Sequence, residues 1–252
     1  MTAVIEKYLR LYSEPETQAL NDFTACYEHC LVLPLYREPH QALERFCRFA
    51  NQQGKTLIIA IINRPDNDDN IEWATKIMNQ LAAISDKVSA TWCSDDHLAL
   101  WSIKNHSGLL IVDRCLDGQP IPQKQGVGLA RKIGADIACQ LIHRGNINSS
   151  WIHNSDGDAS LPSDYFLATN QLDDLKDSAA YYPFQHVFID NKIAQLPTQL
   201  YEFSLHYYVE ALRWAGSCYS YHTIGSIIVI NYNHYAQSRG FPKRAGAEDF
   251  YL

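Results

Sequence analysis

Three uninterrupted apolar runs, each short enough to be a single strand, constrain the fold most strongly. They are LVLPLY (31–36), LIIAIIN (57–63) and GLLIVDR (108–114). A strand with this composition is buried on both faces, as in the sheets of α/β proteins. Apolar residues at helical spacing follow the first run in HQALERFCRFANQQGK and the second in IEWATKIMNQLAAI. The alternation predicts an α/β fold with a mostly parallel central sheet and helices on both faces.

The rest of the chain divides less regularly. An amphipathic lead at about 15–28 precedes the first strand, SATWCS (89–94) is a further candidate strand, and residues 127–145 form the clearest helix. WIHN leads into a polar loop, and a short helix follows at 163–170. Predicted strands at 184–190 and 226–231 flank a Tyr-rich helix at 196–216, and a short helix follows the second of them. The tyrosines at 201, 207, 208, 219 and 221 are interpreted mainly as core and rim packing, with a sugar-binding surface as the alternative.

Composition restricts the class of partner. The 252 residues carry a net charge of −7, and their Lys and Arg residues form no basic stripe, so nucleic acid is not expected as a partner. No apolar run reaches the roughly 20 residues of a transmembrane helix, and the first residues do not resemble a signal peptide. We therefore expect a cytoplasmic protein, with association with the inner face of a membrane left open. The Cys26, His29, Cys30 group lacks a second cysteine pair, which disfavours a zinc site.

Two acidic residues stand one residue apart in WIHNSDGDASLPSDYF (151–166). Asp156 and Asp158 follow strand-like sequence, and ligands of α/β sheets bind beyond the carboxyl ends of strands. Ionised carboxylates this close repel one another unless a cation or hydrogen-bond donors offset them. A calcium loop is excluded because Ala159 and Tyr165 occupy the positions that would need Gly and Glu. A divalent metal with few protein ligands and a solvated Asp-Gly turn both remain open.

Five different segments follow one another along the chain in a specific order. LVLPLYREP, IIAIIN with its acidic loop, KQGVGLARKIGAD, NSDGD and RGFPKRAGAEDFYL together resemble the family 2 glycosyltransferases of GT-A fold. The resemblance covers nearly the whole chain from residue 30 onward. It implies an N-terminal helical extension over 1–29 and a Rossmann-type GT-A domain over 30–252. The chain ends three residues after Asp249, whereas relatives usually continue, so this domain is either shortened at its C-terminus or carries a minimal acceptor side.

The resemblance also implies roles for individual residues. Those expected to bind the nucleotide part of a nucleotide-sugar donor are Pro34, Tyr36, Glu38, Asn63, Lys124, Gly126, Arg131 and Asp156. Lys124, Gly126 and Arg131 would lie near the ribose and diphosphate. Asp156 and Asp158 would hold Mg²⁺ or Mn²⁺ on the phosphates. Glu248 and Asp249 would supply the general base, with the choice between them open.

The implied activity is metal-dependent, inverting transfer of a sugar to an acceptor hydroxyl. A metal stabilises the charge that develops on the diphosphate, and a carboxylate on the opposite face of the sugar accepts the hydroxyl proton. UDP- and GDP-sugars are the expected donors, and the acceptor is left open among glycans, lipids and small molecules. Arg37, Asn63 and Arg239 depart from the family pattern, which leaves the nucleotide base of the donor undetermined.

Two other functions remain open: a non-catalytic module of the same fold that binds nucleotide sugars or glycans, and a nucleotidyltransferase. The intact acidic pairs disfavour the binding module, and the lack of glycine in REPHQALER disfavours the nucleotidyltransferase. His222 either faces the sugar or acceptor or is an ordinary hydrogen-bonded histidine.

Overall fold

The computed structural model describes residues 2–85, 90–95, 97–116, 119–174, 176–187 and 192–252. In the first half of the chain the elements are α1 (Thr2–Leu11), the 3-10 helix η1 (Pro15–Leu20), β1 (His29–Leu35), α2 (His40–Gln53), β2 (Thr56–Asn63), α3 (Glu72–Ile84), β3 (Trp92–Asp95), β4 (Leu98–Ser102) and β5 (Gly108–Arg114). They continue with α4 (Gly126–His143), β6 (Trp151–Asn154), η2 (Tyr165–Gln171), β7 (Ala179–Tyr181), α5 (Lys192–Trp214), η3 (Gly225–Ile227), β8 (Ile228–Asn231) and α6 (Tyr232–Ser238).

The expected α/β class is confirmed, and the sheet is mixed. Its strand order is β3-β4-β5-β2-β1-β6-β8-β7. The four central strands β5, β2, β1 and β6 are parallel, whereas the pairs β3–β4, β4–β5, β6–β8 and β7–β8 are antiparallel. The expectation of a mostly parallel sheet therefore holds only for its centre. One reason is β4, which the sequence analysis missed: only residues 103–107 join it to β5, and so short a connection permits an antiparallel pair but no parallel crossover.

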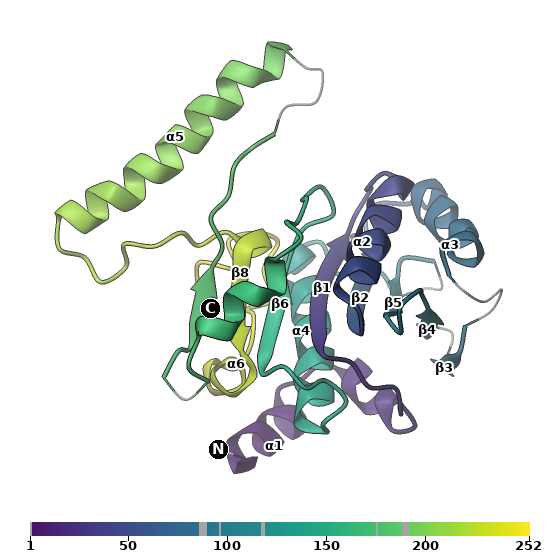
Figure 1. The fold of residues 1–252 in the computed structure, drawn as a ribbon. Helices are drawn as coiled ribbons and strands as arrows, with labels where there is room; N and C mark the ends of the chain where they lie inside the picture. Colours follow the sequence, from purple (N-terminus) through teal and green to yellow (C-terminus); the bar gives the residue numbers. More distant parts are fainter. Residues whose placement is uncertain (1, 86–89, 96, 117–118, 175, 188–191) are drawn as a thin grey trace.

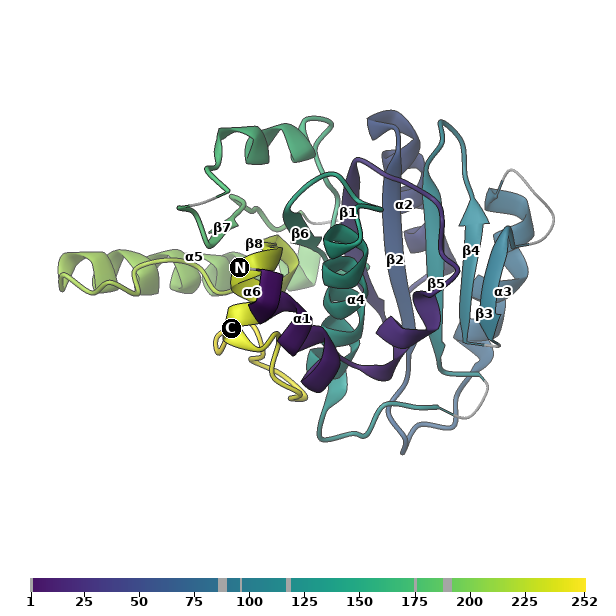
Figure 2. The same ribbon diagram turned by 90° about the horizontal axis from the view of Figure 1, so that it is seen from below.

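The two faces of the sheet bury alternate residues of the same strands. Cys30 and Val32 of β1 join the cluster that contains α1, α4 and α6, while Leu31 and Leu33 join the cluster that contains α2 and α3. Figure 2 shows α4 on one side of the sheet and α2 and α3 on the other. Successive side chains of a strand point to opposite faces, so an uninterrupted apolar run is what two covered faces require.

The N-terminal region differs from the expectation of an amphipathic lead at 15–28. The α-helix lies earlier, at Thr2–Leu11, and only a 3-10 helix forms from Pro15 onward. Proline has no backbone N–H to donate inside a helix, so it is tolerated only in the first turn of a helix that continues downstream of it. Ile5 and Tyr8 of α1 are buried against the α4 side of the sheet.

The strand predicted at 184–190 is wrong for residues 184–187, which are irregular; residues 188–190 lie outside the described part of the chain. Phe184 stacks on His206 of α5, with ring centroids 5.1 Å apart, so this segment packs on a helix and pairs with no strand. The edge strand is instead β7, at Ala179–Tyr181, and the strand predicted at 226–231 forms from Ile228.

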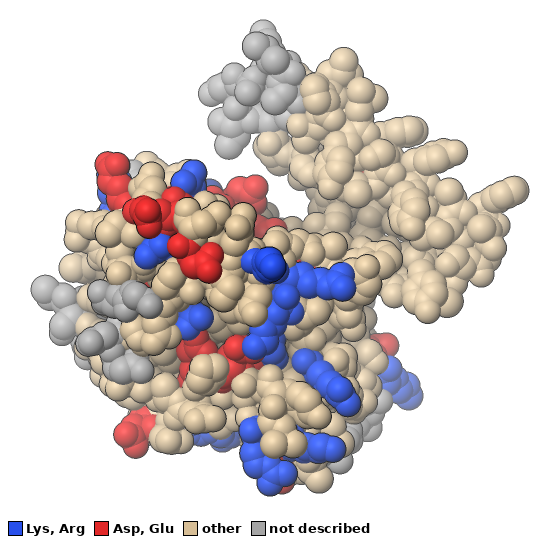
Figure 3. All heavy atoms as spheres, turned by 180° about the vertical axis from the view of Figure 1, so that it is seen from behind, with Lys and Arg blue, Asp and Glu red and all other residues tan. Residues whose placement is uncertain are grey.

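Helix α5 extends away from the sheet (Figure 1). A stripe of its large apolar residues, at 196, 200, 203, 207 and 214, is exposed, and the part of α5 visible in Figure 3 carries no Lys, Arg, Asp or Glu. Tyr201, Tyr207, Tyr208, Tyr219 and Tyr221 are all exposed too. The interpretation of these tyrosines as core packing is therefore wrong. Among the described residues, no helix has the length and apolarity needed to cross a membrane.

Candidate functional site

Three strand ends converge at one edge of the sheet. Tyr36 and Glu38 follow β1, Asn63 is the last residue of β2, and Asp156 and Asp158 follow β6. Because β1 pairs in parallel with both β2 and β6, the carboxyl ends of all three strands lie side by side. This is the edge at which open α/β sheets bind their ligands.

A cavity of about 610 Å³ opens at this edge. Its size lies within the range of small-molecule sites in proteins. The residues expected from the sequence that line it are Pro34, Tyr36, Glu38, Asn63, Gly126, Arg131, Asp156, Asp158, Glu248 and Asp249. The sequence order scatters these residues over more than 200 positions, and the fold brings all ten to one cavity.

Arg131 lies at the centre of the site and is 2% exposed. Its Nη2 donates to Asp156 Oδ1 at 2.8 Å, and its Nε donates to Glu248 Oε1 at 3.0 Å. Its Nη1 donates to the carbonyl oxygen of Gly225 at 3.2 Å. Burial disfavours the charged guanidinium, but the charges of Asp156 and Glu248 outweigh this and raise the pKa of Arg131. Each of its three nitrogens thus donates to a protein acceptor, and Arg131 also lines the cavity.

Asp158 is the exposed member of the acidic pair, and within the described chain it forms no ion pair with a Lys or Arg. Glu38 lies close to it across Gly157, where a Cβ atom would come within 2.5 Å of the Glu38 Cγ. Burial and the neighbouring charges of Asp158 and Asp156 raise the pKa of Glu38. Three carboxylates therefore share one region, where Arg131 pairs with Asp156 and the charge of Arg45 offsets part of that of Glu38.

This excess of negative charge fits a divalent cation. No group of three or more His, Cys, Asp or Glu among the described residues could hold a metal by itself. Mg²⁺ typically takes one or two carboxylates from the protein and its remaining ligands from water and substrate phosphates. Asp158, with Asp156 beside it, suits an ion of that kind.

The two C-terminal acids have different surroundings. Glu248 is 3% exposed and faces Arg131. Asp249 is only partly buried, and its Oδ2 accepts a hydrogen bond from the backbone N–H of Gly225 at 2.7 Å. Asp249 lines two cavities at once, the one described above and a neighbouring groove. Glu248 is therefore placed to hold Arg131, whereas Asp249 is accessible from two sides.

The acidic loop after β2 holds in place the part of the cavity wall that follows β1. Asp68 pairs with Arg37 at 2.8 Å and accepts a hydrogen bond from the Tyr36 hydroxyl at 2.9 Å. Hydrogen bonding to Arg37 lowers the pKa of Asp68 to about 2. This acidic loop thus orients an aromatic ring at the cavity.

Two expected residues lie elsewhere. Lys124 is exposed and does not line the cavity, although its neighbours Gln123 and Gly126 do. His222 lines the neighbouring groove, where its ring meets those of Tyr181 and His206 at 5.7 and 4.9 Å. Burial, and then the nearby His206, lowers the pKa of His222.

The sequence analysis missed Gly128, which brings the C-terminal acids to the site. Its N–H donates to the carbonyl oxygen of Arg244 at 2.9 Å, and a Cβ atom there would lie 2.5 Å from the carbonyl oxygens of Pro242 and Arg244. Only glycine permits this close approach of the chain to the first turn of α4. The second glycine of GVGLARK was the sequence signal that could have indicated this close approach.

No protein-family model and no curated protein matches this chain.

Proposed function

We propose that this chain is a metal-dependent inverting glycosyltransferase of GT-A type, similar to family 2. The observation that carries the proposal is that three strand ends, the start of α4 and the C-terminal acids all line the same cavity. The five segments that resemble the family in sequence supply its walls. The central parallel strands β5, β2, β1 and β6 suit a nucleotide-binding α/β domain.

The donor would be a UDP- or GDP-sugar. Its base and ribose would lie against Pro34, Tyr36 and Asn63, where Tyr36 offers a ring held by Asp68. Its diphosphate would lie toward Asp156 and Asp158. Mg²⁺ or Mn²⁺ there would neutralise the charge that grows on the leaving diphosphate. Arg131 would keep Asp156 in place from behind, because its ion pair fixes that carboxylate at the end of β6.

Asp249 is our choice for the general base. Its carboxylate would accept the proton of the acceptor hydroxyl while the hydroxyl oxygen bonds to the anomeric carbon. The bond from that carbon to the diphosphate oxygen breaks in the same step, which inverts the anomeric centre. Glu248 is less suited to this role, because it is buried in an ion pair with Arg131.

Thermal-shift measurements with UDP- and GDP-sugars, with and without Mn²⁺, test the proposal. At a ligand concentration about 100-fold above Kd, binding adds ~2.7 kcal/mol, which for a chain of this size raises Tm by about 5–10 °C. We expect one donor class to give this shift only with metal. Asp158→Asn should abolish the shift, whereas the control Asp69→Asn, at an exposed residue that does not line the cavity, should keep it.

Turnover separates an enzyme from a binding module. Asp249→Asn should retain the metal-dependent shift and lose sugar transfer. A wild-type chain that binds a donor but never transfers or hydrolyses it would be a nucleotide-sugar binding module. If the shift survives the loss of Asp158 unchanged, the metal role assigned to the acidic pair is wrong.

A further inference from the structure

A second groove, of about 900 Å³, adjoins the donor cavity. Asp249 lines both, and the chain passes from one to the other between Thr223, in the groove, and Ile224, in the donor cavity. The groove therefore begins at the side chain to which the preceding section assigns proton transfer. Nothing in the sequence resemblance accounts for it.

One face of the antiparallel strand pair β7–β8, at the edge of the sheet, forms the floor of this groove. Ala179 pairs with Ile230, and Tyr181 pairs with Ile228, across the antiparallel strands β7 and β8. Residues two apart on a strand share a face, as do directly paired residues on neighbouring strands, so all four side chains point the same way. All four line the groove, which gives it a largely apolar base.

Three partly exposed aromatic rings line the groove. Tyr181, Tyr221 and Phe250 line the groove and are 39%, 43% and 59% exposed. They come from β7, from the loop after α5 and from the C-terminal segment. Exposed aromatic faces favour contact with the apolar face of a ring, and ring contacts of this kind add modest but specific affinity.

Polar groups between the rings can hydrogen bond but carry little charge. Ser178 Oγ lies 3.1 Å from His234 Nδ1, and Thr223 and Gln237 also line the groove. Asp249 is its only Asp, Glu, Lys or Arg within the described chain. An anionic ligand would meet the Asp249 carboxylate with no Lys or Arg among the described lining residues to offset it, so the groove suits a neutral ligand.

We propose that this groove binds a neutral saccharide, the acceptor, with a sugar ring against Tyr221 and Phe250. The inference rests on the proposed function for the chemical step. The acceptor hydroxyl oxygen bonds to the donor's anomeric carbon, the bond to the diphosphate breaks, and the hydroxyl proton passes to Asp249. Sugar binding in the groove itself needs neither donor nor metal.

Saturation-transfer NMR with the full chain and no nucleotide tests the binding directly. The probes are the methyl glycosides of glucose, galactose and N-acetylglucosamine, with methyl glucuronide as the anionic comparison. We expect saturation transfer to at least one neutral glycoside and at least fivefold weaker binding of the glucuronide. Tyr221→Ala and Phe250→Ala should each weaken the neutral glycoside on the order of fivefold, the equivalent of one ring contact.

Tyr208→Ala is the matched control. Tyr208 lies on α5 and is 58% exposed but does not line the groove, so its loss should leave binding unchanged. Saturation transfer to no neutral glycoside, or equal binding by the wild type and both groove variants, would overturn the proposal. If that happens while a nucleotide sugar still stabilises the chain with Mn²⁺, the proposed function stands. If a glycoside binds at the groove but no nucleotide sugar stabilises the chain, the groove proposal stands and the proposed transferase function is rejected.

Discussion

Arg131 joins two acids that are far apart in the chain. Asp156 follows β6, Glu248 lies in the C-terminal segment 117 residues from Arg131, and the guanidinium contacts both. The residue types and their strand-end positions could be predicted from the sequence. The pairing could not, because a contact over that separation leaves no mark in local spacing. The contacts of Arg131 with both acids were therefore not predicted.

Replacing Arg131 by Met should destabilise the fold. It would leave the Glu248 side chain, 5% exposed, without its counter-charge. Removing one partner of a buried ion pair typically costs about 3–5 kcal/mol. Urea unfolding would measure this loss, and Arg131→Met combined with Glu248→Met should recover much of it. A loss below about 1 kcal/mol for Arg131→Met would show that Glu248 is not held by this pair.

His153 should make stability depend on pH. Burial lowers the pKa of this histidine well below 6.5, so in the folded protein it stays neutral where the unfolded chain is protonated. The unfolded state then binds more protons. The free energy of unfolding is highest above about pH 6.5 and falls by roughly 1.4 kcal/mol per unit as pH decreases toward the folded pKa.

Urea unfolding between pH 5 and 8 would measure this slope in the wild type and in His153→Phe. The variant should have a flatter profile, because its ring does not titrate. The Tyr182 hydroxyl, which contacts His153 Nδ1, keeps its hydrogen bond to the Tyr165 carbonyl oxygen. A slope unchanged by the substitution would assign the pH dependence to another group, such as His29, whose pKa burial also lowers.

At the scale of elements, the sequence predicted what hydrophobic periodicity encodes. The strand at 108–114 and the helix α4 lie at or within two residues of their predicted bounds. Periodicity identifies an apolar face but does not say what covers it. Helix α5 was therefore predicted as a helix, while the exposure of its apolar stripe was not. FQHVFID was predicted as a strand, yet Phe184 and His186 contact α5.

Gly128→Ala tests whether α4 positions the C-terminal acids. The new Cβ would clash with the backbone of Pro242 and Arg244, so the segment that carries Glu248 and Asp249 must shift. Overpacking of this kind usually costs about 1–3 kcal/mol. We expect a lower Tm and loss of sugar transfer. Gly246→Ala, where a Cβ atom would meet nothing within 4 Å, should leave Tm unchanged; equal Tm values for both variants would refute the close packing.

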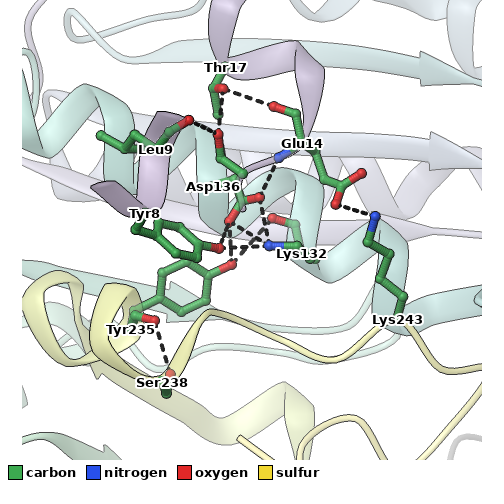
Figure 4. A network of polar contacts seen from close by, with 10 residues as sticks. Tyr8, Leu9, Glu14, Thr17, Lys132, Asp136, Tyr235, Ser238 and Lys243 are labelled. Carbon is green, nitrogen blue, oxygen red and sulfur yellow. Dashed lines mark hydrogen bonds and ion pairs between the residues drawn. The ribbon is translucent and has the colours of Figure 1, made fainter. Parts of the chain in front are cut away.

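At the scale of the whole molecule, a buried polar network joins three segments far apart in the chain. Tyr8 of α1 and Tyr235 of α6 both donate to Asp136 of α4, with a Tyr235 distance of 2.7 Å (Figure 4). Lys132 lies 3.0 Å from Asp136 and donates to the Tyr8 hydroxyl at 2.7 Å. The backbone N–H of Glu14 donates to the same carboxylate. The sequence analysis placed α4 by its apolar face and had no means to expect that its charged residues are buried too.

A second contact ties the same regions together near the protein surface. Lys243, just before the C-terminal acids, pairs with Glu14 at 2.7 Å. Segments near both ends of the chain thus meet beside α4, the helix that also supplies Arg131. The helix that supplies Arg131 to the cavity at the strand ends is thus also the helix on which α1 packs.

Lys132→Met should reveal how strongly this network holds the molecule together. It would leave Asp136, fully buried, without its nearest cation, although the two tyrosines and the Glu14 N–H still donate to it. The expected loss in free energy of unfolding is about 3–5 kcal/mol, measured by urea denaturation. Lys76→Met is the matched control, since Lys76 forms an exposed pair with Glu72 at the same helical spacing and should cost less than about 0.5 kcal/mol.

A double variant separates charge from packing. Lys132→Met with Asp136→Asn removes both charges and keeps an amide oxygen that can accept from Tyr8 and Tyr235. If the buried charge causes the loss, the double variant should be more stable than Lys132→Met alone, with a coupling of at least about 0.5 kcal/mol. Additive losses, or a Lys132→Met effect no larger than that of Lys76→Met, would mean that apolar packing alone holds α1 and α6 against α4.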